Sequence, residues 1–127
     1  MKIQELSGGR LDYWVASILG LEGIRVEPNT ACTYIDSSLA MKVRVQFSPS
    51  ANWAQGGPLI ERAGISIWRY DETSGDRTGM WFAAAHGIHG WDDGSIAGAG
   101  KECSGEAPLV AAMRAYVASK FGNEVPD

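Results

Sequence analysis

The stretch FSPSANWAQGGPLIERAG, at Phe47–Gly64, determines how the chain passes from one predicted strand to the next. The preceding segment, Lys42–Phe47, alternates apolar and polar side chains, which is typical of an antiparallel strand with one face in water. The following segment, Ile65–Tyr70, is predicted as a second strand. Between them, Gly56-Gly57-Pro58 is expected to interrupt the chain, because glycine tolerates positive φ angles and proline suits the first helical position. We therefore predict an elbow, packed against the last helix, that consists of an irregular turn at Ser50–Gln55 and a short helix at Leu59–Ala63.

Apolar side chains at helical spacing predict one helix near each end of the chain. The first begins at the N-cap Ser7 and ends at Gly20, and its buried stripe is predicted to be Leu11, Trp14, Val15, Ile18 and Leu19. Asp12 is expected in the first turn, where the helix dipole favours a carboxylate. The second helix begins at Pro108 and ends at Gly122, and its buried stripe is predicted to be Leu109, Met113, Tyr116 and Val117.

The remaining segments predict short strands and loops. Ile24–Val26 and Cys32–Ile35 are predicted as strands, and Met80–Ala85 as a strand that returns from a hairpin loop at Asp71–Gly79. His86–Gly105 contains six glycines and is predicted as a mobile loop. We expect a single domain, residues 1–127, of the α+β class. Its small antiparallel sheet of three to four strands would carry both amphipathic helices on one face.

Charge and cysteine content argue against several classes of protein. The net charge is −4 and the Lys and Arg residues are scattered, which argues against binding nucleic acid mainly through phosphates and against a polybasic membrane patch. No apolar run approaches the roughly 18 residues of a membrane span. Two cysteines are too few for a secreted disulfide framework, and the N-terminal residues lack an apolar signal region. We expect a cytoplasmic protein with reduced thiols, and a single Cys32–Cys103 bridge is the alternative.

The sequence carries no recognisable catalytic motif. It contains no G-x-S-x-G elbow, and neither cysteine has an adjacent His or Lys that would lower its thiol pKa. The glycine-rich run at residues 94–101 lacks the spacing of a phosphate-binding loop. One enzyme alternative is a small metal-assisted hydrolase that uses His86, His89 and either Asp92 or Asp93 as ligands. Gly87 and Gly90 argue against a rigid arrangement of these ligands, which favours a loop that carries two histidines without a metal site. No catalytic residue, metal or cofactor is therefore expected.

A second alternative is a weak binder of single-stranded nucleic acid. Its polar surface would consist of Lys42, Arg44, Gln46 and Arg69. Trp53 or Tyr70 would stack on the bases. The net negative charge instead favours a solvated sheet face, so nucleic acid is not the expected partner.

Two longer stretches resemble a known family. SPSANWAQGGPLIER (Ser48–Arg62) and APLVAAMRAYVASKFGNEV (Ala107–Val125) are similar to the NinX-like family of small uncharacterised proteins from tailed phages and prophages. Leu11-Asp12 followed by Trp14-Val15-Ala16 resembles the opening helix of that family. The Asp71–Ser104 segment has no counterpart in the resemblance, so the histidines there inherit no role. The resemblance implies a phage accessory protein of the bacterial cytoplasm and supplies no catalytic residue.

The residues that match the family's motifs form our candidate binding surface: Asp12, Trp53, Gln55, Gly56, Gly57, Pro58, Glu61 and Arg114. A tryptophan beside glycines and charged side chains has the composition of a recognition patch. We therefore predict a non-enzymatic interaction module for an unknown protein or small molecule, and homo-oligomerisation remains open. In the structural alternative, Trp53 packs at the edge of the core and Glu61 caps a helix or pairs with Arg114.

Overall fold

The last helix, α3 (Pro108–Phe121), lies at the centre of the fold. The computed structural model describes residues 1–38, 40–73, 75–98 and 101–126. As the sequence predicts, α3 begins at Pro108 and is followed by Gly122. Its buried residues extend well beyond one stripe: Leu109, Ala111, Ala112, Met113, Ala115, Tyr116, Val117 and Ala118. The prediction that α3 is amphipathic is therefore wrong, because its small alanines allow neighbours to pack closely against several sides.

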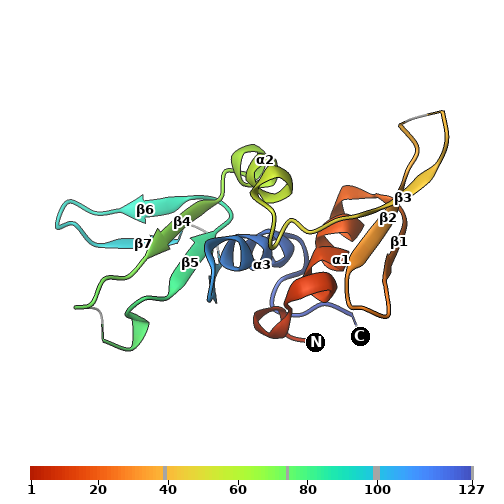
Figure 1. Ribbon diagram of the computed structural model, residues 1–127. Coiled ribbons are helices and arrows are strands. Elements are labelled where there is room, and N and C mark those ends of the chain that lie inside the picture. The colour runs from red at the N-terminus through yellow and green to blue at the C-terminus, as the bar shows by residue number, and fades with distance from the viewer. Residues whose placement is uncertain (39, 74, 99–100, 127) are drawn as a thin grey trace.

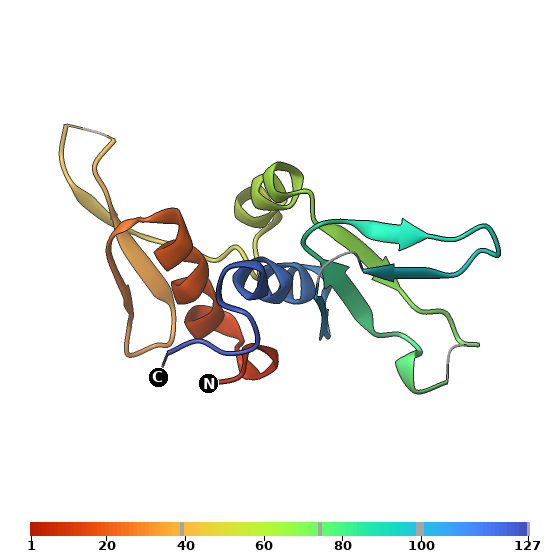
Figure 2. The same ribbon diagram turned by 180° about the vertical axis from the view of Figure 1, so that it is seen from behind.

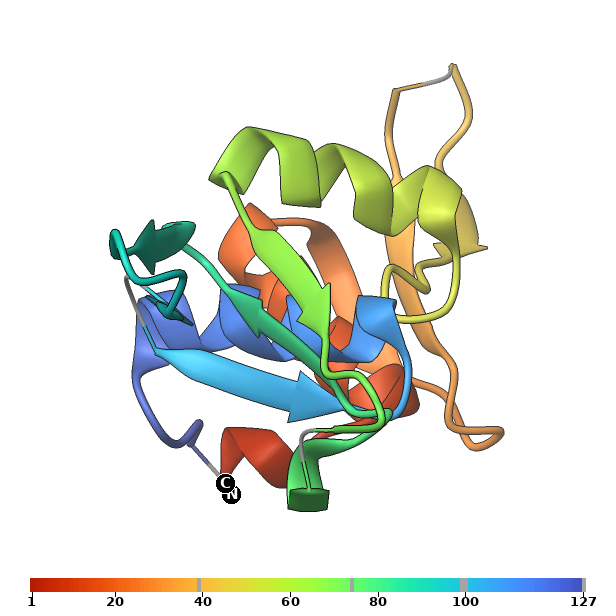
Figure 3. The same cartoon turned by 90° about the vertical axis from the view of Figure 1, so that its left-hand side faces the viewer.

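Both helices and strands cover α3. The elements that contact it are α1 (Gly8–Leu19), α2 (Trp53–Ala63), the short 3-10 helix η1 (Ile3–Glu5), β4 (Ser66–Arg69), β5 (Trp81–Ala84) and β8 (Glu102–Gly105). Figure 1 shows α1 on one side of α3 and the β4 and β5 strands on the other. Figure 3 looks onto the sheet formed by β4, β5 and β8, with α3 behind it and α2 above. The core of the protein therefore surrounds the last helix.

In the described residues, eight strands form three separate antiparallel sheets. β1 (Glu22–Val26), β2 (Cys32–Asp36) and β3 (Val43–Gln46) form the first, in that order, and β1 and β2 contact α1. The second has the order β4-β5-β8. β6 (Ile88–Gly90) and β7 (Ile96–Gly98) form a hairpin that extends to the opposite end of the molecule from the first sheet (Figure 2). The α+β class is confirmed, whereas one sheet with two helices on one face is wrong.

The glycine-rich segment His86–Gly105 is not one loop. The strands β6, β7 and β8 lie within it, and residues 99–100 are outside the described part of the chain. Cys103 in β8 is buried against the core. A Cβ atom at Gly105 would lie 2.7 Å from the backbone nitrogen of Ala111, so this glycine permits β8 to approach α3 closely. The mobility of the segment stays a prediction.

The boundaries of α1 are as predicted, but one of its side chains is not where we expected it. The helix follows Ser7 and ends at Gly20, which adopts the left-handed conformation with a φ of 70°. Asp12 lies in the second turn and is buried, so its predicted place beside the positive end of the dipole is wrong. Within the described ranges, no helix has the length and apolar character needed to cross a membrane.

The predicted interruption at Gly56-Gly57-Pro58 is also wrong, because α2 is continuous. Asn52 caps its first turn by accepting a hydrogen bond from the Ala54 N–H at 2.9 Å. Pro58 removes one backbone hydrogen bond, but it lies on the exposed side of the helix, where water can satisfy the freed carbonyl. Gly57 lacks the Cβ atom that would crowd the following proline ring. The helix therefore accommodates its internal proline.

Gly56 and Gly57 allow a matched test of how α2 packs. A Cβ atom at Gly56 would lie 2.4 Å from the Pro49 carbonyl oxygen and 2.8 Å from Leu109 Cδ2, whereas one at Gly57 meets no atom within 4 Å apart from its chain neighbours and the backbone of α2 itself. We expect Gly56→Ala to lower the free energy of unfolding by about 1–3 kcal/mol, because backbone atoms must move. Gly57→Ala adds a contact only with the ring of the adjacent Pro58, so it should lower the free energy of unfolding by less than Gly56→Ala does. Chemical denaturation measures both, and equal effects would contradict this packing of α2.

Candidate functional site

A buried carboxylate holds the start of the candidate surface in place. Asp12 Oδ1 accepts a hydrogen bond from the Ser50 N–H at 2.9 Å, and the two residues are only 3% and 6% exposed. Burial raises the pKa of Asp12 to about 6, although hydrogen bonds from Ser50 act in the opposite direction. Asp12 therefore ties α1 to the turn that leads into α2.

Gln55 closes the same turn from the other side. Its Oε1 accepts a hydrogen bond from the Ser48 N–H at 2.6 Å, and its Nε2 donates to the Gln46 carbonyl at 3.4 Å. The Gln46 side chain in turn donates to Ser48 Oγ at 2.9 Å. These bonds connect the end of β3 to the first turn of α2. Asp12, Gln55 and Gly56 thus hold the segment between β3 and α2 in place from its buried side.

The other candidate residues on α2 point outward. Trp53, Gly57 and Glu61 recur every four residues, which places them on one side of the helix. Pro58 and Arg62 form the adjacent row. Trp53 is 56% exposed, although tryptophan is usually well buried, so it does not pack at the edge of the core. We call the set of Trp53, Pro58, Glu61 and Arg62 the outward α2 face.

Arg114 lies apart from this face. Its Nε donates to the Leu6 carbonyl at 2.9 Å and its Nη1 to the Ser104 carbonyl at 2.7 Å, so it links the end of η1 to β8. Burial lowers the pKa of Arg114. Both residues are described, and no ion pair joins Arg114 to Glu61. The predicted surface is therefore divided among the inside of the elbow, the outside of α2 and the η1–β8 junction.

The histidine segment does not assemble a metal site. His86 and His89 are exposed, and the His89 ring packs edge-to-face on Trp91 with a centroid distance of 4.4 Å. Asp93 accepts hydrogen bonds from the N–H and the hydroxyl of Ser95. Across the described ranges, no group of three His, Cys, Asp or Glu side chains could hold a metal ion. The ligand set of the metal-assisted hydrolase is therefore not brought together.

The two cysteines are buried free thiols in separate sheets, so the alternative of a Cys32–Cys103 bridge is wrong. Burial, together with the charge of Asp12, raises the pKa of the Cys32 thiol to about 11. Burial likewise raises the pKa of the Cys103 thiol. Both thiols therefore stay protonated at neutral pH, which makes them poor nucleophiles.

The residues of the nucleic-acid alternative do not share one surface. Arg44 donates to the Gly23 carbonyl at 2.8 Å and to Thr33 Oγ1 at 3.0 Å, and Lys42 pairs with Glu22 at 3.2 Å. Arg69 belongs to the other sheet. Its guanidinium lies 5.9 Å from the centroid of the Trp81 ring. The cations are therefore separated, and those of the first sheet are engaged with neighbouring groups.

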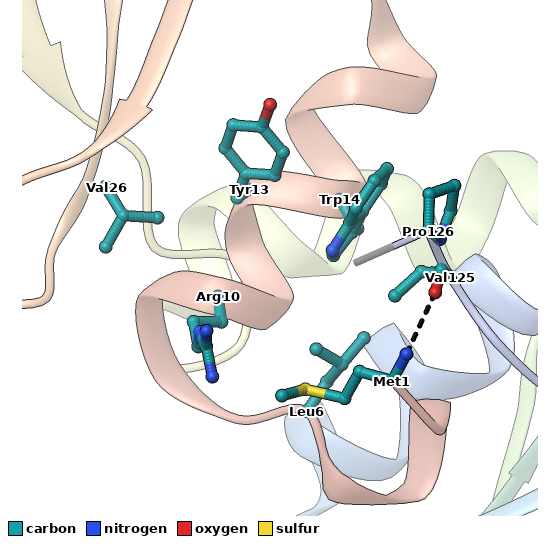
Figure 4. A pocket seen from close by; sticks show the side chains of 8 residues that line it. All are labelled: Met1, Leu6, Arg10, Tyr13, Trp14, Val26, Val125 and Pro126. Atoms are coloured by element: carbon teal, nitrogen blue, oxygen red, sulfur yellow. Dashed lines mark hydrogen bonds between the residues drawn. The ribbon is translucent and has the colours of Figure 1, made fainter.

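The structure contains a cavity beside α1 that the sequence did not predict (Figure 4). Its volume is about 270 Å³, and its lining residues are Met1, Leu6, Arg10, Tyr13, Trp14, Val26, Val125 and Pro126. Met1 and Val125 exchange backbone hydrogen bonds of 3.0 Å, which bring the two chain ends together here. Trp14 was expected in a buried stripe, but it is half-buried and borders the cavity. Only the meeting of distant segments creates this cavity, so no local pattern indicated it.

The raised pKa of Asp12 predicts how stability depends on pH. The folded protein keeps this proton up to about pH 6, whereas the unfolded chain loses it near the ordinary value of 3.8. The free energy of unfolding should therefore fall by up to about 3 kcal/mol in total as the pH rises from about 3 to about 7. Asp12→Asn retains an acceptor for Ser50 and should remove this decrease, as measured by urea denaturation across that range.

Asp12→Ala is the matched control. It also removes the ionisation, but it leaves the buried Ser50 N–H without its acceptor, which should cost about 1–3 kcal/mol at every pH. An Asp12→Asn protein with the same pH dependence as the parent would show that Asp12 does not titrate in this range.

Comparison with known proteins agrees with the resemblance seen in the sequence. A family model described as Bacteriophage P22, NinX matches residues 2–120, and this range includes the 71–104 segment that the resemblance did not cover. No curated protein matches the chain. Because the family model extends over most of its length, the chain belongs to the NinX family of phage proteins.

Proposed function

We propose that this phage protein is a non-enzymatic accessory module that binds another protein through the outward α2 face, in the cytoplasm of the bacterial host. The observation that carries the proposal is the 56% exposure of Trp53 at the start of a helix whose other side is docked on the core. Tryptophan is prominent among the residues that dominate binding energy at protein interfaces. An exposed tryptophan on a fixed helix is therefore suited to recognition.

The support beneath the outward α2 face favours the same function. Leu59, on the inner side of α2, is buried, and Gly56 lies against the Pro49 backbone and Leu109. Asn52 accepts a hydrogen bond from the Ala54 N–H in the first turn of α2, and Gln55 accepts one from the Ser48 N–H in the segment before the helix. A surface that is ordered before binding loses less conformational entropy when the complex forms. The outward α2 face is thus preorganised.

The shape and chemistry of this face favour a protein partner over a small molecule. It is the convex side of a helix, whereas small-molecule sites are concave. The charged Glu61 and Arg62 lie beside the apolar Trp53 and Pro58, an arrangement that matches the apolar centre and polar rim of protein interfaces. The face offers no hydroxyl, thiol or imidazole, and for that reason we favour binding over catalysis.

Site-specific crosslinking identifies the partner and measures the role of Trp53. A photoreactive amino acid at the exposed position 54, next to Trp53, in phage-infected cells, should link the protein to one recurrent partner that mass spectrometry identifies. With that purified partner, Trp53→Ala should weaken binding about tenfold or more in calorimetry. Because the side chain is exposed, the same substitution should change the free energy of unfolding by only about 0.5 kcal/mol.

Met41 provides the control, because it is 75% exposed and lies between β2 and β3, outside the outward α2 face. Met41→Ala should leave the affinity unchanged, and a photoreactive group at position 41 should not capture the same partner. Equal capture from both positions, or equal affinities of the two variants, would rule out the outward α2 face. Capture of a second copy of the chain would instead identify the face as a homo-oligomer interface.

A further inference from the structure

The cavity beside α1 is apolar and has aromatic walls. Tyr13 and Trp14 project from α1 and meet edge-to-face, with ring centroids 5.3 Å apart (Figure 4). Leu6 and Val125 are buried and form part of the lining, whereas Val26 on β1 is 39% exposed. A volume of about 270 Å³ is near the lower limit of about 300 Å³ for ligand pockets. The cavity therefore suits one ring or one large side chain.

Arg10 gives this apolar cavity a positive charge. Among the described residues that line it, Arg10 has the only charged side chain, and its guanidinium is exposed with no hydrogen-bond or ion-pair partner in the described part of the chain. The N-terminal ammonium of Met1 is a second cation of the lining, and it donates to the Val125 carbonyl. The first turn of α1 contains no acidic residue that would neutralise it. Guanidinium groups bind carboxylates through paired, charge-assisted hydrogen bonds. A ligand that fits here is apolar at one end and carries a carboxylate at the other.

A second hollow continues beyond Arg10. It has a volume of about 360 Å³, and its lining residues are Ser7, Gly8, Gly9, Arg10, Val26 and Thr30. Arg10 and Val26 line both hollows, so the two hollows lie next to each other. Hydroxyl groups and glycine backbone line this second hollow, in contrast to the aromatic walls of the first. Such groups are suited to hydrogen bonds with an extended main chain.

We propose that these two hollows bind the C-terminal residue of a partner polypeptide whose last side chain is aromatic. The aromatic ring enters the cavity beside Tyr13 and Trp14, the terminal carboxylate pairs with Arg10, and the preceding main chain follows the second hollow. The charge of Arg10 selects the carboxylate, and the second hollow accounts for a polypeptide rather than a free aromatic acid. This site is separate from the outward α2 face and does not depend on it.

Short peptides provide the test. We expect the acid form of acetyl-Ser-Gly-Phe to bind in isothermal titration calorimetry and to shift the Trp14 indole N–H signal in NMR spectra. The peptide with a C-terminal amide should bind about tenfold more weakly, because it cannot form the charge-assisted pair. Arg10→Gln should weaken binding of the acid about tenfold and leave binding of the amide unchanged. Arg69→Gln, at an exposed arginine of β4 outside both proposed surfaces, is the matched control and should alter neither affinity.

The same measurements can overturn the proposal. Equal affinities for acid and amide, or an acid affinity unchanged in Arg10→Gln, would show that Arg10 does not bind a carboxylate. Phenylacetate that binds as tightly as the tripeptide acid would show a small-molecule pocket with no role for the second hollow. Absence of binding at millimolar peptide concentrations would reject the site. Thermal denaturation of each variant confirms that it is folded before binding is measured.

Discussion

The burial of α3 on several sides is the constraint on which the rest of the structure depends. A helix with no polar side leaves apolar surface in water unless neighbours cover it in several directions. Its alanines allow a close approach, and β8 makes use of it at Gly105, where a Cβ atom would meet the backbone of Ala111. The predicted single sheet, with both helices on one face, would cover only one side of α3 and could not surround it. The strands are therefore divided, and α1, α2 and the β4-β5-β8 sheet cover different sides of α3.

Buried polar groups then determine how the segments around α3 are joined. Backbone donors and acceptors that leave water need partners within the protein. The Asp12 side chain accepts a hydrogen bond from the Ser50 N–H, and Arg114 donates to the carbonyls of Leu6 and Ser104. Each side chain comes from a helix and reaches a segment far away in the sequence. The family resemblance includes both residues, and in this structure both connect segments instead of facing solvent.

The two surfaces that we propose for recognition are separate, and they differ in kind. The outward α2 face is convex and presents an exposed indole on a supported helix. The two hollows beside α1 are concave; the first has aromatic walls, and the Arg10 guanidinium that both share has no partner among the described residues. The thiols are buried and protonated, and the described histidines and carboxylates do not converge on a metal site. These features are the basis on which we propose an accessory role for this member of the NinX family.

The sequence by itself determined the limits of α1 and α3, the α+β class and the family, because capping residues, helical spacing and family motifs are local features. It also indicated that the 47–64 stretch would form an elbow beside the last helix. Only the tertiary structure decided that α2 is continuous through Pro58, that Asp12 is buried, and that Arg114 joins η1 to β8. The physical reason is that each outcome depends on a distant group: the Pro49 backbone against Gly56, the Ser50 N–H beside Asp12, and the Leu6 and Ser104 carbonyls that hold Arg114.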